Sequence, residues 1–164
     1  GVTDLTLEQI AKIFSGDITN WSDVGGTAGT IAVTVRDAES GTRDCFDTVM
    51  KAAYSSYAIP DSANEVGGSG AMVTTVNGNA TAIGYVSLGY LGQLTSGSAV
   101  KVEGVDATPA NVLNESYQIQ RNLILATMGD PSGAVQNFFN WILGPQGQQI
   151  AAKKDFVPVG SVTV

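Results

Sequence analysis

The residues in this chain best suited to bind a ligand lie in one short run, from Arg36 to Arg43. The guanidinium of Arg36 is a planar fork of donors that matches two oxygens of a tetrahedral anion. Ser40 and Thr42 add hydroxyl donors, and Gly41 lets a ligand approach the backbone without a Cβ in the way. If a helix begins at Ser40, its free N–H groups and partial positive charge favour the same kind of ligand. The run therefore predicts an anion-binding site.

The same run also has a purely structural explanation. Ser40 would cap a helix, as serine often does, and Arg36 would pair with a nearby carboxylate of Asp37, Glu39 or Asp44. The local pattern alone does not separate the two explanations. The chain has only three arginines, however, and two of them flank this run in a protein of net charge −7. That clustering favours the anion site.

The elements that would position this run are predicted by the hydrophobic pattern. Residues 31–35 form a short, apolar, β-branched segment typical of a buried strand, which places Arg36 at the carboxyl end of that strand. A helix is expected from Ser40, with its core face made by Phe46, Val49, Met50 and Ala53. In open α/β sheets, ligands bind at the carboxyl ends of strands. The predicted site lies at such a point.

Elsewhere, strands alternate with helices. A capping box at Thr6–Gln9 opens a helix that Gly16 ends. Ser69 is interpreted as the N-cap of another helix, with a cleft-lining role as the alternative. Residues 55–68 are expected to be mostly loop. Further strands are expected at residues 82–86, 100–105 and 117–126. Further helices are expected to begin at Thr108 and at Ser132, and a last helix is expected after Gly144-Pro145, ending at about Lys154. The alternation predicts an α/β fold with a mixed or mostly parallel sheet flanked by helices.

Composition excludes several classes of function. The net charge of −7 argues against a nucleic-acid or acidic-membrane partner. The chain has no histidine, which removes the usual general base and the commonest metal ligand. Its single cysteine allows neither an internal disulfide nor a thiolate metal cluster. No metal and no cofactor are therefore expected.

Several segments resemble phosphate-binding proteins of the phosphate ABC importer, the PstS type, in the order in which that family has them from the opening of its second lobe. Any one match is weak, but together they span nearly the whole chain. They are Leu5–Ile10, Ile13–Gly16, Ile18–Trp21, Val35–Arg36, Ser40–Arg43, Ala82–Leu88, Val102–Val105, Phe138–Trp141, Gly147–Gln148 and Phe156–Val159.

The resemblance implies one lobe of a type II periplasmic-binding-protein fold, residues 1–117, plus a crossover strand and helices of the other lobe, residues 118–164. It implies phosphate contacts from Arg36, Ser40, Gly41 and Thr42, and extends them to Arg43. The start of the first lobe, which would supply further donors and a carboxylate, is not matched in this chain. The resemblance also implies that the protein delivers phosphate to the membrane subunits of an ABC transporter. It implies an extracytoplasmic location, with a lipid anchor on the full-length protein.

Alternatives remain open from the sequence. Sulfate or molybdate could replace phosphate, and an adhesion or signalling domain could keep this fold without an anion. An enzyme would need Ser40 or Thr42 as nucleophile, with Lys51 the nearest base in sequence. We expect a binding protein rather than an enzyme. We also expect the chain alone to bind phosphate weakly and to self-associate, because apolar residues after Tyr117 would lack their partners.

Overall fold

A computed structural model describes residues 1–159 of the chain. Over these residues short strands alternate with α-helices and two 3-10 helices, η1 and η2. In chain order the elements are β1 (Asp4–Leu5), α1 (Leu7–Phe14), η1 (Trp21–Val24), β2 (Ala32–Arg36), α2 (Gly41–Ala53), β3 (Asn64–Val66), α3 (Ser69–Gly78), β4 (Ala82–Ile83), η2 (Leu88–Gln93), β5 (Lys101–Val102), α4 (Pro109–Leu113), α5 (Gly133–Ile142) and α6 (Pro145–Lys153).

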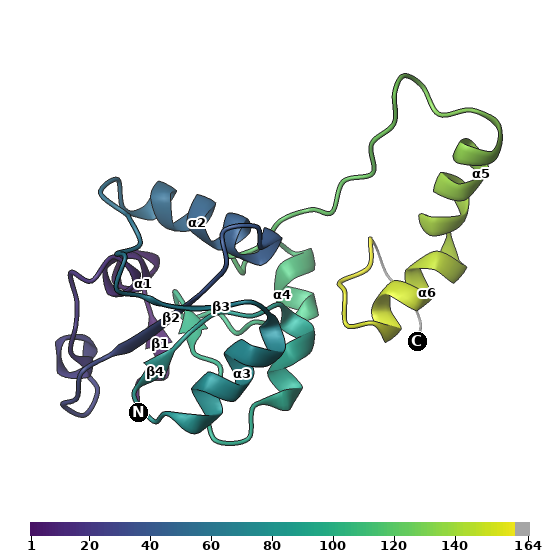
Figure 1. Ribbon diagram of the computed structural model, residues 1–164. Helices are drawn as coiled ribbons and strands as arrows, with labels where there is room; N and C mark the ends of the chain where they lie inside the picture. Colours follow the sequence, from purple (N-terminus) through teal and green to yellow (C-terminus); the bar gives the residue numbers. More distant parts are fainter. Residues whose placement is uncertain (160–164) are drawn as a thin grey trace.

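The central strand is β2, which pairs in parallel with β3 on one side and β4 on the other. A second parallel pair joins β1 to β5. Helices α1 and α2 lie on one side of β2 and α3 lies on the other (Figure 1). The prediction of an α/β fold with a mostly parallel sheet is confirmed. Because β2, β3 and β4 run the same way, their carboxyl ends meet at one edge.

The hydrophobic core lies between the sheet and helices α1 and α2. Thr6 and Gln9 form the predicted capping box, which presents the apolar face of α1 to the core. Phe14 meets Phe46 of α2 edge-on, with 4.7 Å between ring centroids. Phe46 in turn stacks on Tyr85 at 4.1 Å. Such aromatic contacts add to the burial of the rings, and they hold α2 against the strand that carries the predicted site.

Other sequence expectations need correction. The strand expected at residues 117–126 does not form: the segment begins with bends, and it pairs with no described strand. Residues 55–68, expected as mostly loop, also contain the three-residue strand β3, whose Glu65 and Val66 pair with the end of β2. The strands expected at residues 82–86 and 100–105 are paired only at β4 and β5. A three-residue strand such as β3, with one β-branched residue, is too short to be recognised from the sequence pattern.

The last third of the chain leaves the sheet. Tyr117 and Ile119 still pack against the hydrophobic core. Beyond them an extended segment leads to α5 and α6, two consecutive helices that stand apart from the sheet (Figure 1). This part exposes large apolar side chains, among them Leu123, Ile124, Met128, Val135, Phe138, Trp141, Ile150 and Phe156. Among the described residues, no helix is long and apolar enough to cross a membrane.

Candidate anion-binding site

Arg36 is the last residue of β2, at the sheet edge where the parallel strands end. Its backbone N–H donates to the hydroxyl of Tyr85 at 3.1 Å, which ties the strand end to the aromatic stack. A tight turn follows, in which the Ser40 N–H donates to the Asp37 carbonyl oxygen at 3.1 Å. The strand end and Ser40, the N-cap of α2, are therefore separated by only three residues, as the sequence predicted.

The Arg36 side chain is recessed, with 13% of its surface exposed. Its Nη1 donates to the Ser69 hydroxyl at 3.2 Å, and its Nη2 pairs with the Asp37 carboxylate at 3.3 Å. Its Nε is buried and has no hydrogen-bond partner among the described residues. Each terminal nitrogen of a guanidinium carries two N–H groups, so the two contacts leave a second N–H on each. The Arg36 guanidinium is thus held through both terminal nitrogens and still has N–H groups available to a ligand.

Ser40 is the N-cap of α2, as predicted. Its hydroxyl oxygen accepts from the Arg43 backbone N–H at 3.3 Å, and the residue is 6% exposed. Gly41 and Thr42 are the first two helical residues, so their N–H groups have no partner within the helix. An anion at this end of α2 would meet those two N–H groups and the partial positive charge of the helix. The structural and the anion-binding explanations of Ser40 are therefore compatible.

Arg43 points towards the sheet edge. Its Nη1 donates to the Arg36 carbonyl oxygen at 2.7 Å and to the Glu65 carboxylate at 3.1 Å, and its Nε pairs with Asp47 at 3.4 Å. Its side chain is 19% exposed. These contacts give Arg43 a bracing role between α2 and the end of β2. A direct contact between Arg43 and a ligand stays a prediction.

Ser69 was interpreted as a helix N-cap, and the structure corrects this. The N-cap of α3 is Gly68, which makes no side-chain cap, and Ser69 is the first helical residue. Its hydroxyl is turned towards Arg36 instead. The alternative, in which the start of α3 lies beside the site, is the one that the geometry favours. The run of small residues at 67–70 was the available signal, but only the β2–β3 pairing puts it next to Arg36.

Arg121 is a residue that the sequence analysis missed. Its guanidinium lies directly against Gly41, where a Cβ on that residue would collide with Nη2 of Arg121. Its Nη1 pairs with Asp44, one turn into α2, at 3.3 Å. All three arginines of the chain therefore gather around the start of α2. The rarity of arginine was a signal, but no local pattern links positions 80 residues apart.

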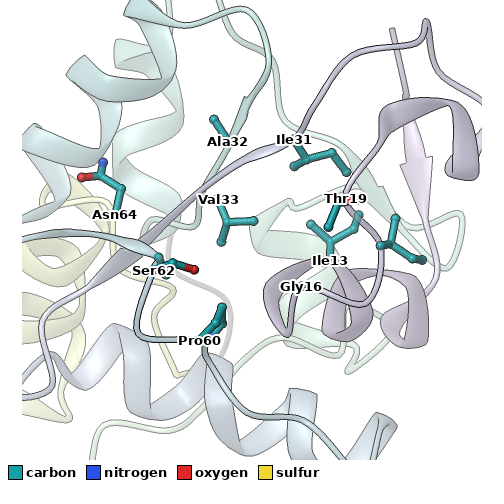
Figure 2. Close-up of a pocket in the computed structure, with 11 residues that line it drawn as sticks. Ile13, Gly16, Thr19, Ile31, Ala32, Val33, Pro60, Ser62 and Asn64 are labelled. Atoms are coloured by element: carbon teal, nitrogen blue, oxygen red, sulfur yellow. The ribbon is translucent and has the colours of Figure 1, made fainter.

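A separate cavity of about 340 Å³ lies towards the other end of β2 (Figure 2). Ile31, Ala32 and Val33 line it from the strand, and Ile13, Pro60 and Asn64 line it from neighbouring segments. None of the residues around it is charged, and it contains none of the predicted site residues. It does not suit a multiply charged anion. Within residues 1–159, no cluster of three or more carboxylate or cysteine side chains is arranged to hold a metal ion.

Comparisons with known proteins agree with the resemblance seen in the sequence. A family model described as a PBP superfamily domain matches residues 1–146. The crystal structure of a phosphate ABC transporter substrate-binding protein from Clostridium perfringens, with bound phosphate, superimposes with a TM-score of 0.82 and 40% identity. The superposition covers 97% of this chain and 64% of that one.

Of two relatives found by sequence, one is named a phosphate-binding protein and the other an alkaline phosphatase. The phosphate-binding protein PstS 2 of Streptococcus agalactiae is 31% identical over 138 residues, which is 80% of this chain and 46% of that protein. Alkaline phosphatase L of Pseudomonas aeruginosa is 30% identical over 131 residues, covering 65% of this chain and 33% of that protein. The chain thus spans about half the length of the Streptococcus relative.

Proposed function

The chain belongs to the PBP superfamily, among the PstS-type phosphate-binding proteins, and on that premise we propose that it captures inorganic phosphate as one half of a solute receptor. The observation that carries the proposal is the placement of Arg36 at the end of β2, four positions before Ser40, the N-cap of α2. A braced guanidinium with spare N–H groups lies four residues from a helix N-terminus whose first N–H groups are unpaired. Together they supply charge-assisted donors to one tetrahedral anion.

Four residues would contact the phosphate from this lobe. Arg36 would donate from its two terminal nitrogens, Ser40 from its hydroxyl, and Gly41 and Thr42 from their backbone N–H groups. The Thr42 hydroxyl, which is half-buried, would add a further donor. Asp37 would serve to orient Arg36, with which it already pairs. The carboxylate that accepts the proton of phosphate would come from the first lobe.

Residues 118–164 would belong to the first lobe in a two-lobed receptor. The described part of this segment exposes Phe138, Trp141 and Ile150 at 51%, 46% and 50%. Large apolar side chains gathered on one pair of helices are typical of a surface that packs on another part of the protein. We propose that the first lobe covers it, and that without this cover the chain self-associates and binds phosphate weakly.

The receptor would hand phosphate to the membrane subunits of an ABC transporter. This role places it outside the cytoplasmic membrane, with a lipid anchor on the full-length protein. The relative in Clostridium perfringens is named for such a transporter, which supports the proposal.

We propose that the site binds without catalysis, although one relative is named a phosphatase. A serine nucleophile needs its base within hydrogen-bond reach. Lys51, the nearest candidate in sequence, lies eleven residues beyond Ser40 on the same helix, about 16 Å along its axis. A colorimetric phosphomonoester assay should therefore detect no turnover.

Calorimetry on the two-lobed protein tests the proposal. Phosphate should bind to a single class of site, and sulfate should bind much more weakly because it carries no proton for the first-lobe carboxylate. Sulfate binding as tightly as phosphate would change the assigned anion. Binding of neither would overturn the function.

A further inference from the structure

Arg121 reaches the start of α2 from a distant part of the chain. The Tyr117 N–H donates to the Asn111 carbonyl oxygen at 2.9 Å, and the side chains of Tyr117 and Ile119 pack against the hydrophobic core. These contacts fix the backbone just before Arg121, which is the point where the chain leaves the sheet. The guanidinium is delivered to Gly41 by an anchored segment rather than by a free tail.

A positively charged side chain at the N-terminus of a helix is electrostatically unfavourable. The N-terminus of α2 carries a partial positive charge, so a guanidinium beside Gly41 is repelled by it. The compensation among the described residues is an ion pair with Asp44 at 3.3 Å, in which the two side chains are 43% and 75% exposed. Exposed pairs of this kind stabilise a protein little. Two neighbouring positive groups, here the Arg121 guanidinium and the N-terminus of α2, are instead what an anion that contacts both requires.

Gly41 belongs to the same arrangement. Its backbone has no left-handed conformation that would demand glycine. The atom that a Cβ would meet is Nη2 of Arg121. A glycine here therefore makes room for the guanidinium as well as for a ligand. By contrast, a Cβ on Gly70, near the start of α3, would meet nothing within 4 Å.

We propose that Arg121 is a further anion-binding residue, which contributes a second guanidinium to the site built by Arg36 and the start of α2. The inference rests on the proposed function, since it assigns a residue to that same site. Arg121 lies on the segment that leads out of this lobe, so the phosphate contacts its positive charge at the junction between the sheet and the rest of the chain.

The test is phosphate calorimetry on the two-lobed protein with Arg121→Gln, and Lys101→Gln is the matched control. Lys101 lies on β5, which pairs with β1 rather than with β2. It resembles Arg121 in exposure, at 46%, and in its single ion pair, with Asp106 at 3.1 Å. Both variants remove one positive charge from the protein. Arg121→Gln should weaken phosphate binding about tenfold, and Lys101→Gln should change it less than about twofold.

Arg121→Lys should fall between the wild type and Arg121→Gln, because lysine keeps the charge but loses the planar fork. The defect of Arg121→Gln should shrink as salt rises, since a partly exposed charge is screened. A role in stability alone would not produce that salt dependence. If Arg121→Gln fails to fold, Arg121→Lys measured at low and high salt makes the same comparison.

The outcomes separate the inference from the function on which it rests. If the wild type binds phosphate, and Arg121→Gln binds it as tightly as Lys101→Gln does, Arg121 has no role in binding. The proposed phosphate receptor would still stand. Tighter binding by Arg121→Gln would likewise overturn the role of Arg121, because it would make Arg121 a competitor of the ligand. Failure of the wild type to bind phosphate would overturn both.

Discussion

Nη1 of Arg43 donates a hydrogen bond of 2.7 Å to the backbone carbonyl oxygen of Arg36. This contact ties the first turn of α2 to the last residue of β2. Because the charged donor is also paired with Glu65 of β3, it joins three elements at the carboxyl edge of the sheet. The backbone of Arg36 is thereby fixed relative to the first turn of α2 before any ligand arrives.

Arg36→Ala should abolish most phosphate binding in the two-lobed protein. Charge-assisted hydrogen bonds contribute about 1.5–3 kcal/mol each, so losing a two-pronged contact implies at least about a tenfold loss of affinity. Arg36→Lys should recover only part of it, because lysine lacks the fork. Calorimetry measures the affinity, and thermal unfolding should show that both variants fold. Unchanged affinity in Arg36→Ala would remove Arg36 from the site.

Ser69→Ala should weaken phosphate binding although Ser69 itself is not expected to contact the phosphate. The Ser69 hydroxyl accepts a hydrogen bond from Nη1 of Arg36 and so orients the guanidinium. We expect a loss of about fivefold, within the usual worth of one such bond, and recovery in Ser69→Thr. Thr74→Ala is the control, since its hydroxyl on the same helix donates to the Gly70 carbonyl oxygen. Equal affinities of Ser69→Ala and Thr74→Ala would contradict this role.

Gly41→Ala should keep the fold and lose phosphate affinity. The added Cβ would collide with the end of the flexible Arg121 side chain, which can move away. Helix propensity favours alanine at this position, so the melting temperature should hold. Gly70→Ala, where the Cβ would meet nothing within 4 Å, should leave binding intact. A double-mutant cycle of Gly41→Ala with Arg121→Gln should be non-additive, and additive losses would count against the contact.

The protein should lose stability in alkali. Burial, followed by the hydrogen bond to Asp47, raises the pKa of Tyr57 far above its ordinary value, and burial also raises the pKa values of Tyr85 and Tyr117. Below pH of about 10 the phenols are protonated in both states, so their contribution to stability is constant. Above it the unfolded chain loses protons first, and the free energy of unfolding falls. Denaturant titrations from pH 7 to 11 measure this.

Tyr57→Phe isolates one of these phenols. It removes the 2.7 Å hydrogen bond to Asp47 and should cost about 1 kcal/mol at neutral pH. Its stability should then fall less steeply above pH 10 than that of the wild type. Parallel curves for the two proteins would show that Tyr57 does not contribute to the alkaline loss.

The 164-residue chain alone should form dimers or larger species and bind phosphate far more weakly than the two-lobed protein. Exposed apolar patches find partners, and one lobe leaves part of the anion in water. Light scattering and calorimetry measure the two effects. Replacing Phe138 and Trp141 with serine should shift the chain towards monomer. A monomer with the full affinity would place the complete site within this chain.

The sequence by itself determined the local half of the site. The β-branched run at residues 31–35 predicted the strand, Ser40 predicted the helix start, and their spacing put Arg36 at the strand end just before α2. These features depend on residues within one or two turns of each other, through hydrophobic periodicity and capping. They are therefore visible without the fold.

Tertiary structure decided the rest. The β2–β3 register brings Ser69 to Arg36 across 33 residues, and the packing of Tyr117 and Ile119 brings Arg121 to Gly41 across 80. The direction of Arg43, towards a carbonyl oxygen rather than outward, also depends on where β3 lies. The strand expected at residues 117–126 does not form because extended residues need a neighbouring strand to complete a ladder. Contacts between distant positions follow from chain packing, to which local periodicity and capping contribute no information.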